Sequence, residues 1–273
     1  TEQDPYVIET AAELKYFAAR VNGGDTMAGC FVLLGADISL DGITLTPIGT
    51  QQSPFAGSLD GGGHTLRDLT ISVTEAAAAG FFAYLSGNVS HLTLENAAVT
   101  LTTETANQIG ALGALTGVQS SGSVISDVLV SGTVGMQGFS DSSCGGIAGS
   151  AKGTIQDSYS TADVSIPSGS GSAYAGGVAG RNSGLIERCY ASGCVSVGPL
   201  ARRVAGGIAG MAAGTLRDCA SRGDRKTIFS SGSTGYCGGI AGYLKEGGTA
   251  QSCITAGKIS FSTNLTDYAP VSY

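Results

Sequence analysis

A glycine-rich pentapeptide recurs four times along this chain at nearly equal intervals. It reads GGIAG or GGVAG and begins at residues 145, 176, 206 and 238, which gives spacings of 31, 30 and 32 residues. Two degenerate copies precede these, GFFAYL from residue 80 and GALGAL from residue 110. A unit of this length that cannot bury its own apolar side buries it against the next copy. The repeat therefore predicts a solenoid, with six copies from Gly80 to about Phe261.

The apolar residues inside each copy follow the pattern of short strands. In the third copy, Ile147, Ile155 and Val164 lie in alternating stretches that glycines separate, and the helical period of 3.6 is missing. Three short strands per copy, stacked about 4.8 Å apart, would place equivalent side chains in ladders along the axis. The pattern thus predicts an all-β fold, a parallel β-helix, with one internal apolar ladder formed by Ile125, Ile155, Ile186 and Leu216.

The first part of the chain, residues 1–79, differs from the repeats and is expected to hold a cap and the first coils. Thr10 and Glu13 form a capping box, and apolar residues follow at the spacing of one helix face: Leu14, Phe17, Ala18 and Val21. This predicts a short helix at about residues 10–22 that covers the first rung, whose unpaired strand edge would otherwise recruit another chain. Residues 262–273 are expected to be a polar tail of one continuous solenoid domain.

Two positions of the repeat suggest corners. The paired glycines before each Ile or Val indicate either a positive φ or a backbone too close to a neighbour for a Cβ. Asp127, Asp157 and Asp218 share a second position, which Arg188 takes in the copy between them. We interpret that position as a bend whose polar side chains satisfy local backbone groups. A cation site of stacked carboxylates is the alternative, which Arg188 disfavours.

Three of the seven cysteines occupy one repeat position: Cys189, Cys219 and Cys253 stand where the third copy has Ser158. Neighbouring rungs are close enough for a disulfide between Cys189 and Cys219 or between Cys219 and Cys253. We favour a ladder of buried thiols, because free cysteine behaves as a small apolar residue. A zinc site is not expected, since the chain has no CxxC motif and only two histidines.

Charge and composition exclude several classes of partner. The formal net charge is −7, so nucleic acid and anionic lipid would not meet a basic surface. No stretch approaches 18 consecutive apolar residues, so no transmembrane segment is expected. The glycine-rich runs lack the lysine and the following helix of a phosphate loop, so no cofactor is predicted.

The acidic residues of the first coils are the candidates for catalytic chemistry, because β-helices also host polysaccharide lyases and hydrolases. Asp37, Asp41, Asp60 and Asp68 could converge in principle, but Asp60 belongs to a glycine-rich turn and the other three show no pairing in the sequence. His64 and His91 are interpreted as a turn residue and an exposed strand residue. The sequence therefore predicts no catalytic, cofactor-binding or metal-binding residue.

Tyrosines are the residues at which a binding site is most plausible, because glycan and protein ligands both favour aromatic surfaces. Tyr159 and Tyr190 share one repeat position, whereas Tyr174, Tyr236 and Tyr243 lie near later corners. The same residues could equally be stacked in the core or at turns. They are the candidate binding residues.

The repeats resemble those of bacterial proteins with GLUG-type motifs, in which a GGIAG-like strand precedes a segment similar to G-x-I-x-D/N-C-Y-A-x-G-x-V. The similarity is strongest in AGGVAGRNSGLIERCYASGCVSV, which ends at Val197. The upstream stretches DPYVIETAAELKYFA and PFAGSLDGGGHTLRDLTI also resemble the region before such repeats. The resemblance implies a right-handed β-helix in a secreted or cell-surface bacterial protein, and it carries over no catalytic residue. Arg225 and Lys226 depart from the pattern and are expected to break the third strand of the fifth copy.

These observations favour a non-catalytic secreted or cell-surface module for adhesion, display or binding of a glycan or a protein. The alternatives are a carbohydrate-active β-helix enzyme, which would need acidic residues clustered in a cleft, and an accessory region of a larger surface peptidase.

Overall fold

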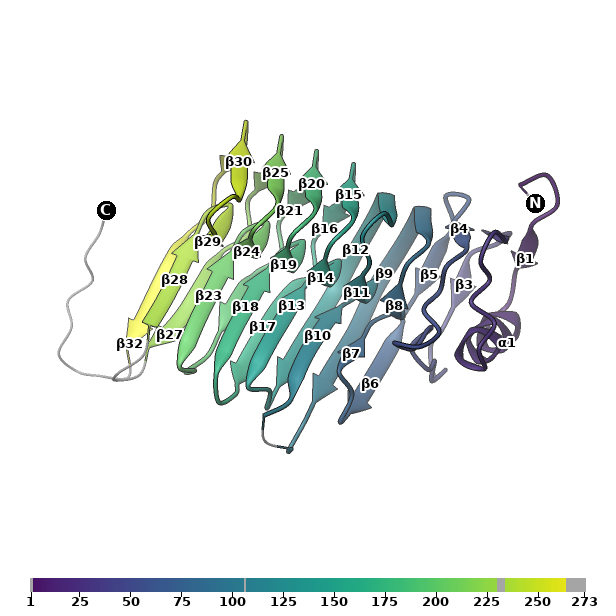
Figure 1. Ribbon diagram of the computed structural model, residues 1–273, viewed down its shortest axis with the longest axis horizontal. Helices are drawn as coiled ribbons and strands as arrows, with labels where there is room; N and C mark the ends of the chain where they lie inside the picture. Colours follow the sequence, from purple (N-terminus) through teal and green to yellow (C-terminus); the bar gives the residue numbers. More distant parts are fainter. Residues whose placement is uncertain (1, 106, 230–233, 264–273) are drawn as a thin grey trace.

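The computed structural model describes residues 2–105, 107–229 and 234–263, and they form a right-handed parallel β-helix of about seven turns. Figure 1 shows the coil with its axis horizontal and a helix, α1 (Ala11–Asn22), at the N-terminal end. This confirms the predicted fold class. Within the described residues, no helix is both long and apolar enough to cross a bilayer.

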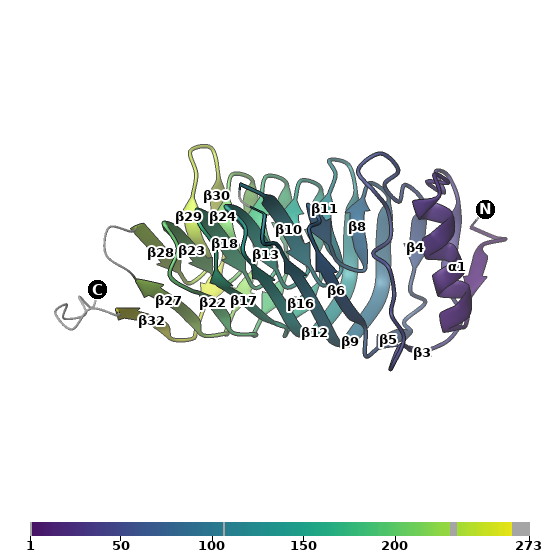
Figure 2. The same cartoon turned by 90° about the horizontal axis from the view of Figure 1, so that it is seen from below.

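Helix α1 begins at the predicted capping box. The Glu13 amide donates to Thr10 Oγ1 (3.2 Å), and the Glu13 carboxylate accepts from the Thr10 amide (3.0 Å). The helix ends at Gly23, whose amide donates to the Ala19 carbonyl (2.9 Å). Its buried face packs on the first coils, where the Phe17 ring meets the Phe55 ring edge-on at 5.5 Å. Figure 2 shows that α1 lies across the N-terminal end of the coil.

The strands form three parallel sheets that run along the axis. Sheet I contains twenty strands among the described residues. Its strands are β1 (Tyr6–Ile8), β2 (Phe31–Leu34), β3 (Ile38–Ser39), β4 (Ser58–Asp60), β5 (Thr65–Arg67), β6 (Thr70–Thr74), β9 (Asn88–Thr102), β12 (Val124–Gln137), β15 (Thr154–Gln156), β16 (Tyr159–Ser160), β17 (Asp163–Ser168), β20 (Leu185–Glu187), β21 (Tyr190–Ala191), β22 (Val195–Val197), β25 (Thr215–Arg217), β26 (Ala220–Ser221), β27 (Arg225–Phe229), β30 (Thr249–Gln251), β31 (Ile254–Thr255) and β32 (Ile259–Thr263).

The other two sheets have six strands each in the described part of the chain. Sheet II consists of β7 (Ala78–Ala79), β10 (Ile109–Gly113), β13 (Asp141–Gly145), β18 (Ser172–Gly176), β23 (Arg202–Gly206) and β28 (Thr234–Gly238). Sheet III consists of β8 (Phe82–Leu85), β11 (Thr116–Gln119), β14 (Ala148–Ala151), β19 (Ala179–Asn182), β24 (Ala209–Ala212) and β29 (Ala241–Leu244). One turn of the coil consists of one strand of sheet II, one strand of sheet III and the sheet I strands that follow them.

The predicted apolar ladder forms on the inner face of sheet I. Ile125 pairs with Ile155, Ile155 with Ile186, and Ile186 with Leu216 in adjacent strands. All four side chains are fully buried. The register of the repeat is therefore the one that the sequence predicted.

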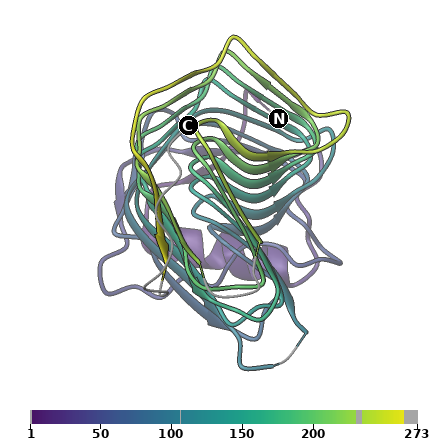
Figure 3. The ribbon, with the colours of Figure 1, turned by 90° about the vertical axis from the view of Figure 1, so that its left-hand side faces the viewer.

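Sheets II and III meet at a sharp corner, and seen along the axis the outline of the coil is indented rather than convex (Figure 3). A Cβ on Gly210 of sheet III would lie 2.7 Å from the Ala175 amide nitrogen of sheet II. In β18, four of the five residues are buried, so both faces of this strand are covered. The corner thus brings the backbones of the two sheets into contact.

Close backbone approach, rather than positive φ, explains the paired glycines of the repeat. A Cβ on Gly177 would lie 2.6 Å from the Ala191 side chain, and one on Gly176 would lie 2.7 Å from the Gly210 amide nitrogen. Neither glycine has a positive φ. A side chain at these positions would therefore push the corner apart.

The shared aspartate position is a bend, as predicted. The φ angles of Asp127, Asp157, Arg188 and Asp218 lie between 50° and 52°, in the left-handed region. The role assigned to the side chains was wrong for Asp157, because its carboxylate accepts two hydrogen bonds from Arg188 (2.6 and 2.9 Å) instead of satisfying local backbone groups. The bend thus places charged side chains one rung apart, where they can pair.

The expectation that Arg225 and Lys226 break a strand was wrong. Strand β27 runs through both residues, and Arg225 aligns with Val195 below and Ile259 above. The Arg225 side chain points inward and is buried, where it donates to Ser221 Oγ, Thr255 Oγ1 and the carbonyls of Gly223 and Gly257. The strand survives because its own turn and the next one supply acceptors for the two terminal nitrogens of the buried guanidinium.

The C-terminal boundary of the coil differs from the predicted one by two residues. Strand β32 extends to Thr263, whereas the sequence placed the start of the polar tail at residue 262. Residues 264–273 of that tail lie outside the described residues.

Candidate functional site

Three of the four candidate aspartates in the first coils each have a separate partner. The fourth, Asp41, forms no side-chain hydrogen bond or ion pair with the other described residues. Asp37 Oδ1 lies 3.2 Å from His64 Nδ1, and Asp60 Oδ1 lies 3.0 Å from His91 Nδ1. Asp68 accepts from the Asn96 amide group (2.7 Å). A hydrogen bond from the Thr65 amide and one from His64 hold the pKa of Asp37 below its usual value. These contacts join successive rungs, so the three paired carboxylates have local structural roles.

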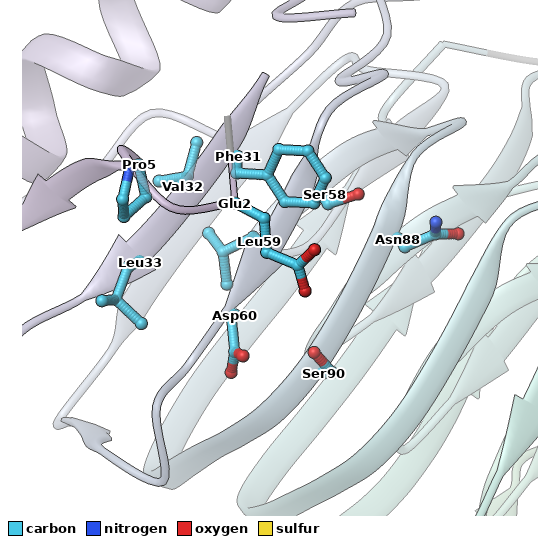
Figure 4. A pocket seen from close by; sticks show the side chains of 10 residues that line it. All are labelled: Glu2, Pro5, Phe31, Val32, Leu33, Ser58, Leu59, Asp60, Asn88 and Ser90. Carbon is cyan, nitrogen blue, oxygen red and sulfur yellow. The ribbon is translucent and has the colours of Figure 1, made fainter. Parts of the chain in front are cut away.

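A pocket of about 180 Å³ lies on the outer face of sheet I near the N-terminus (Figure 4). Glu2 and Asp60 contribute carboxylates to it, and Phe31 and Leu33 contribute apolar surface. Asp60 also accepts from the Gly62 amide (2.8 Å) and pairs with His91. In the described part of the chain, no group of three or more His, Cys, Asp or Glu side chains is arranged to hold a metal ion.

The cysteine ladder consists of thiols. Cys189 and Cys219 are buried and Cys253 is partly buried, and none of the three forms a disulfide. The Sγ of Cys189 lies 3.3 Å from the Glu187 carbonyl oxygen, as Ser158 Oγ does from the Gln156 carbonyl at 2.7 Å. Burial raises the pKa of the Cys189 thiol, and it raises that of Cys219 to about 11. The ladder is therefore a row of small side chains, each of which donates to the backbone carbonyl two residues earlier at the bend.

We expect alkylation to distinguish these thiols by access. Iodoacetamide should modify the exposed Cys194 first in the native protein, and the buried Cys144 and Cys189 last, because a buried thiol neither ionises nor meets the reagent. Peptide mass spectrometry before and after denaturation measures the order. Equal native modification of Cys189 and Cys194 would contradict the burial of the ladder.

Charged side chains form a network on the outer face of sheet I. Glu187 lies between Arg188 and Arg217 and pairs with both, and Arg188 also pairs with Asp157. Hydrogen bonds from Arg217 and Arg188 lower the pKa of Glu187, and the bond from Arg217 has the larger effect. Each charge has an opposite neighbour, so the network offers little unpaired charge to a ligand.

The five candidate tyrosines form two separate groups. Tyr159 and Tyr190 are neighbours along the axis on sheet I, with ring centroids 6.2 Å apart and ring planes tilted by 57°, and Tyr159 is 47% exposed. Tyr174, Tyr236 and Tyr243 lie at the corner of sheets II and III. Tyr236 and Tyr243 have ring centroids 5.5 Å apart.

Two arginines complete the second group. The Arg202 guanidinium carbon lies 4.8 Å from the ring centroid of Tyr243, 5.5 Å from that of Tyr236 and 5.8 Å from that of Tyr174. Arg181 lies 4.2 Å from the Tyr174 centroid and pairs with Asp141. We call this set the tyrosine–arginine cluster: Asp141, Tyr174, Arg181, Arg202, Tyr236 and Tyr243.

The corner itself assembles this cluster. Tyr174 and Tyr236 occupy one ladder of sheet II, and Arg202 occupies a second ladder with Asp141. Arg181 and Tyr243 lie in a ladder of sheet III. Because the outer faces of the two sheets converge at the corner, side chains from four successive rungs meet there. Tyr174 is nearly buried, at 6% exposure, whereas Tyr236 is 41% exposed.

Sequence reasoning found the three tyrosines of the cluster but missed Arg181, Arg202 and Asp141. The arginines do not recur at one repeat position, so no ladder signal marked them. Arg181 and Asp141 are forty residues apart, which is more than one repeat. The available signal was a charged residue beside a glycine corner, because Arg202 precedes the GGIAG segment at residue 206 and Arg181 directly follows the GGVAG segment at residue 176.

Comparison with known proteins gives a structural neighbour and a partial sequence match. A crystal structure described as a "putative immunoglobulin A1 protease" from Bacteroides ovatus has a TM-score of 0.74 and 25% identity, and the alignment covers 100% of this chain and 82% of that one. The chain is also 32% identical to halomucin of Haloquadratum walsbyi over 149 residues, which cover 48% of this chain and 2% of halomucin. No family model matches the chain.

Proposed function

We propose that this chain is a non-catalytic module of a secreted or cell-surface protein, and that it displays side chains for adhesion or for binding a glycan or a protein. The tyrosine–arginine cluster carries the proposal. It gathers partly exposed aromatic rings and a guanidinium at the corner of sheets II and III, and ligand sites commonly combine an aromatic surface with a few oriented polar groups.

The comparisons support a module within a longer polypeptide. The matched segment is a small fraction of halomucin, which is the arrangement expected of a repeat region in a long protein. The β-helix architecture and the GGIAG-type repeats are also consistent with the GLUG-like group of bacterial surface proteins. We therefore propose that the chain lies outside the cell and that it belongs to this group.

A carbohydrate-active enzyme is the less favoured alternative. Hydrolysis of a glycosidic bond requires two carboxyl groups that face the same bond. Asp37, Asp60 and Asp68 instead pair with His64, His91 and Asn96 on adjacent rungs. This separate pairing argues for a structural role of the three carboxylates.

A second candidate function is that of an accessory region in a larger surface peptidase. The similarity to the protein described as an immunoglobulin A1 protease supports it, since the alignment covers the whole of this chain. In that case the coil would bind the peptidase substrate or position a separate catalytic domain.

We expect the purified chain to bind members of a glycan array without altering them. Chromatography and mass spectrometry of the recovered glycans test for product, and incubation with immunoglobulin A1 followed by electrophoresis tests for cleavage. Cleavage of a glycan or of the antibody would contradict the non-catalytic proposal. Binding of immunoglobulin A1 without cleavage, and without any bound glycan, would favour the accessory region.

A further inference from the structure

We infer that the tyrosine–arginine cluster binds a carboxylate-bearing sugar, with Arg202 as the ion-pairing group and Tyr236 and Tyr243 as the stacking surface. The inference rests on the proposed function, because it assigns a site and a ligand class to the same module.

Arg202 is held in place without an ion pair. Arg20, Arg67, Arg181, Arg188 and Arg217 each pair with a carboxylate, whereas no carboxylate among the described residues forms an ion pair with Arg202. Its guanidinium lies against tyrosine rings instead, which orients the group. An arginine in such contacts can still donate hydrogen bonds to a planar carboxylate, and the contacts reduce the entropy lost on binding.

The two outer tyrosines provide the apolar part of the site. Tyr236 is 41% exposed, Tyr243 is partly exposed, and their rings are tilted by 47° to each other, which makes an angled surface. Tyrosine offers a large contact area with only two rotatable side-chain bonds, so little entropy is lost when it is covered. A pyranose ring has apolar C–H faces that fit such a surface, and its hydroxyls can bond to the phenol groups.

The electrostatics of the chain favour a short saccharide with isolated carboxylates over a nucleic acid or a heavily sulfated polymer. The net charge of −7 repels nucleic acids and other densely charged polymers. The second arginine of the cluster, Arg181, is already paired with Asp141. A single available guanidinium beside aromatic rings matches a sugar that carries one carboxylate per ring.

We would test the inference with three acidic probes and their uncharged counterparts. The probes are oligogalacturonate, a hyaluronate oligosaccharide and a sialylated trisaccharide, and the counterparts are the same saccharides with reduced carboxyl groups or without sialic acid. Titration calorimetry measures the affinity of the full chain for each. We expect at least one acidic probe to bind about tenfold more tightly than its neutral counterpart, and added salt to weaken that binding.

Four variants examine the cluster itself. Arg202→Met should weaken binding of the acidic probe about tenfold, and Arg202→Lys should weaken it less because the charge remains. Tyr236→Leu should weaken binding of the acidic probe and of its neutral counterpart alike, by about fivefold. Asp141→Asn should strengthen binding of the acidic probe severalfold, because it releases Arg181 from its partner. A purely structural role of the cluster does not predict this gain in affinity.

Tyr16→Leu is the matched control, since Tyr16 is an exposed tyrosine of α1, far along the chain from the cluster, with no arginine stacked on it among the described residues. It should leave binding unchanged. Thermal melting of every variant, followed by circular dichroism, separates loss of binding from loss of fold.

The outcomes distinguish this inference from the proposed function. Two results would overturn the inference while the module remains a glycan binder. The first is equal affinity for the acidic probes and their neutral counterparts. The second is unchanged affinity for the acidic probe in a folded Arg202→Met variant. Binding of an acidic peptide or of immunoglobulin A1 alone would also overturn it. Failure of every glycan and protein to bind would contradict both.

Discussion

Ile186→Asp is expected to unfold the solenoid over several rungs. Ile186 is fully buried in the middle of the sheet I ladder, between Ile155 and Leu216. The substitution removes a large apolar side chain and places a carboxylate where water cannot reach it, so the loss of stability should exceed about 4 kcal/mol. Neighbouring turns share this ladder, and the damage should spread to them. Circular dichroism during heating measures the loss.

Ala98→Asp provides the control for the new charge. Ala98 is exposed on sheet I between Thr70 and Thr133, so its carboxylate would remain in water. We expect the melting temperature of the Ala98→Asp variant to stay near that of the parent chain. Ile186→Val should cost only about 1 kcal/mol. A normal melting transition in Ile186→Asp would show that the assigned register is wrong.

Gly176→Ala should be the second most damaging change, although it adds a single methyl group. A Cβ at this position would lie less than 3 Å from the carbonyl oxygens of Ala179 and Ile208 and from the amide nitrogen of Gly210. All three contacts are with backbone, which cannot move aside as a flexible side chain can. We expect a loss of about 3 kcal/mol or more, measured by urea unfolding.

Gly135→Ala is the matched control for the corner glycine. Gly135 also lies in a strand and has no positive φ, and the nearest atoms to an added Cβ are Ser165 Oγ at 3.4 Å and Thr100 Cγ2 at 3.9 Å. This variant should be neutral or slightly stabilised, because alanine restricts the unfolded chain. Similar losses in both variants would mean that the corner is not closely packed.

The repeat allowed the fold to be predicted because stacking contacts recur at the repeat period. Each residue of a ladder meets the residue one copy away, so a pattern in the sequence maps directly onto a contact in space. Ile155 pairing with Ile186, and the thiols of Cys189 and Cys219 on adjacent rungs, are of this kind. The bend at Asp127, Asp157 and Asp218 followed from the same logic, and the structure shows that its backbone is left-handed.

The expectations that were wrong involved single side chains whose partners lie on another rung. Arg225 was expected to break its strand, because the sequence did not show the acceptors of residues such as Thr255 around its guanidinium. Asp157 was expected to serve the backbone, but Arg188 lies within reach on the next rung. Partner choice depends on where long side chains point, and a repeat pattern does not encode that direction.

The sequence by itself determined the β-helix, its register and the capped N-terminus, and it named five tyrosines as candidate binding residues. Only the tertiary structure decided which of those tyrosines gather with arginines. Contacts such as that between Arg202 and Tyr243 join a strand of sheet II to a strand of sheet III on a later rung, so they do not follow the repeat period. They depend on the angle at which the two sheets meet. The recurring glycines mark that corner in the sequence, but the close backbone packing that sets its angle exists only in the folded coil.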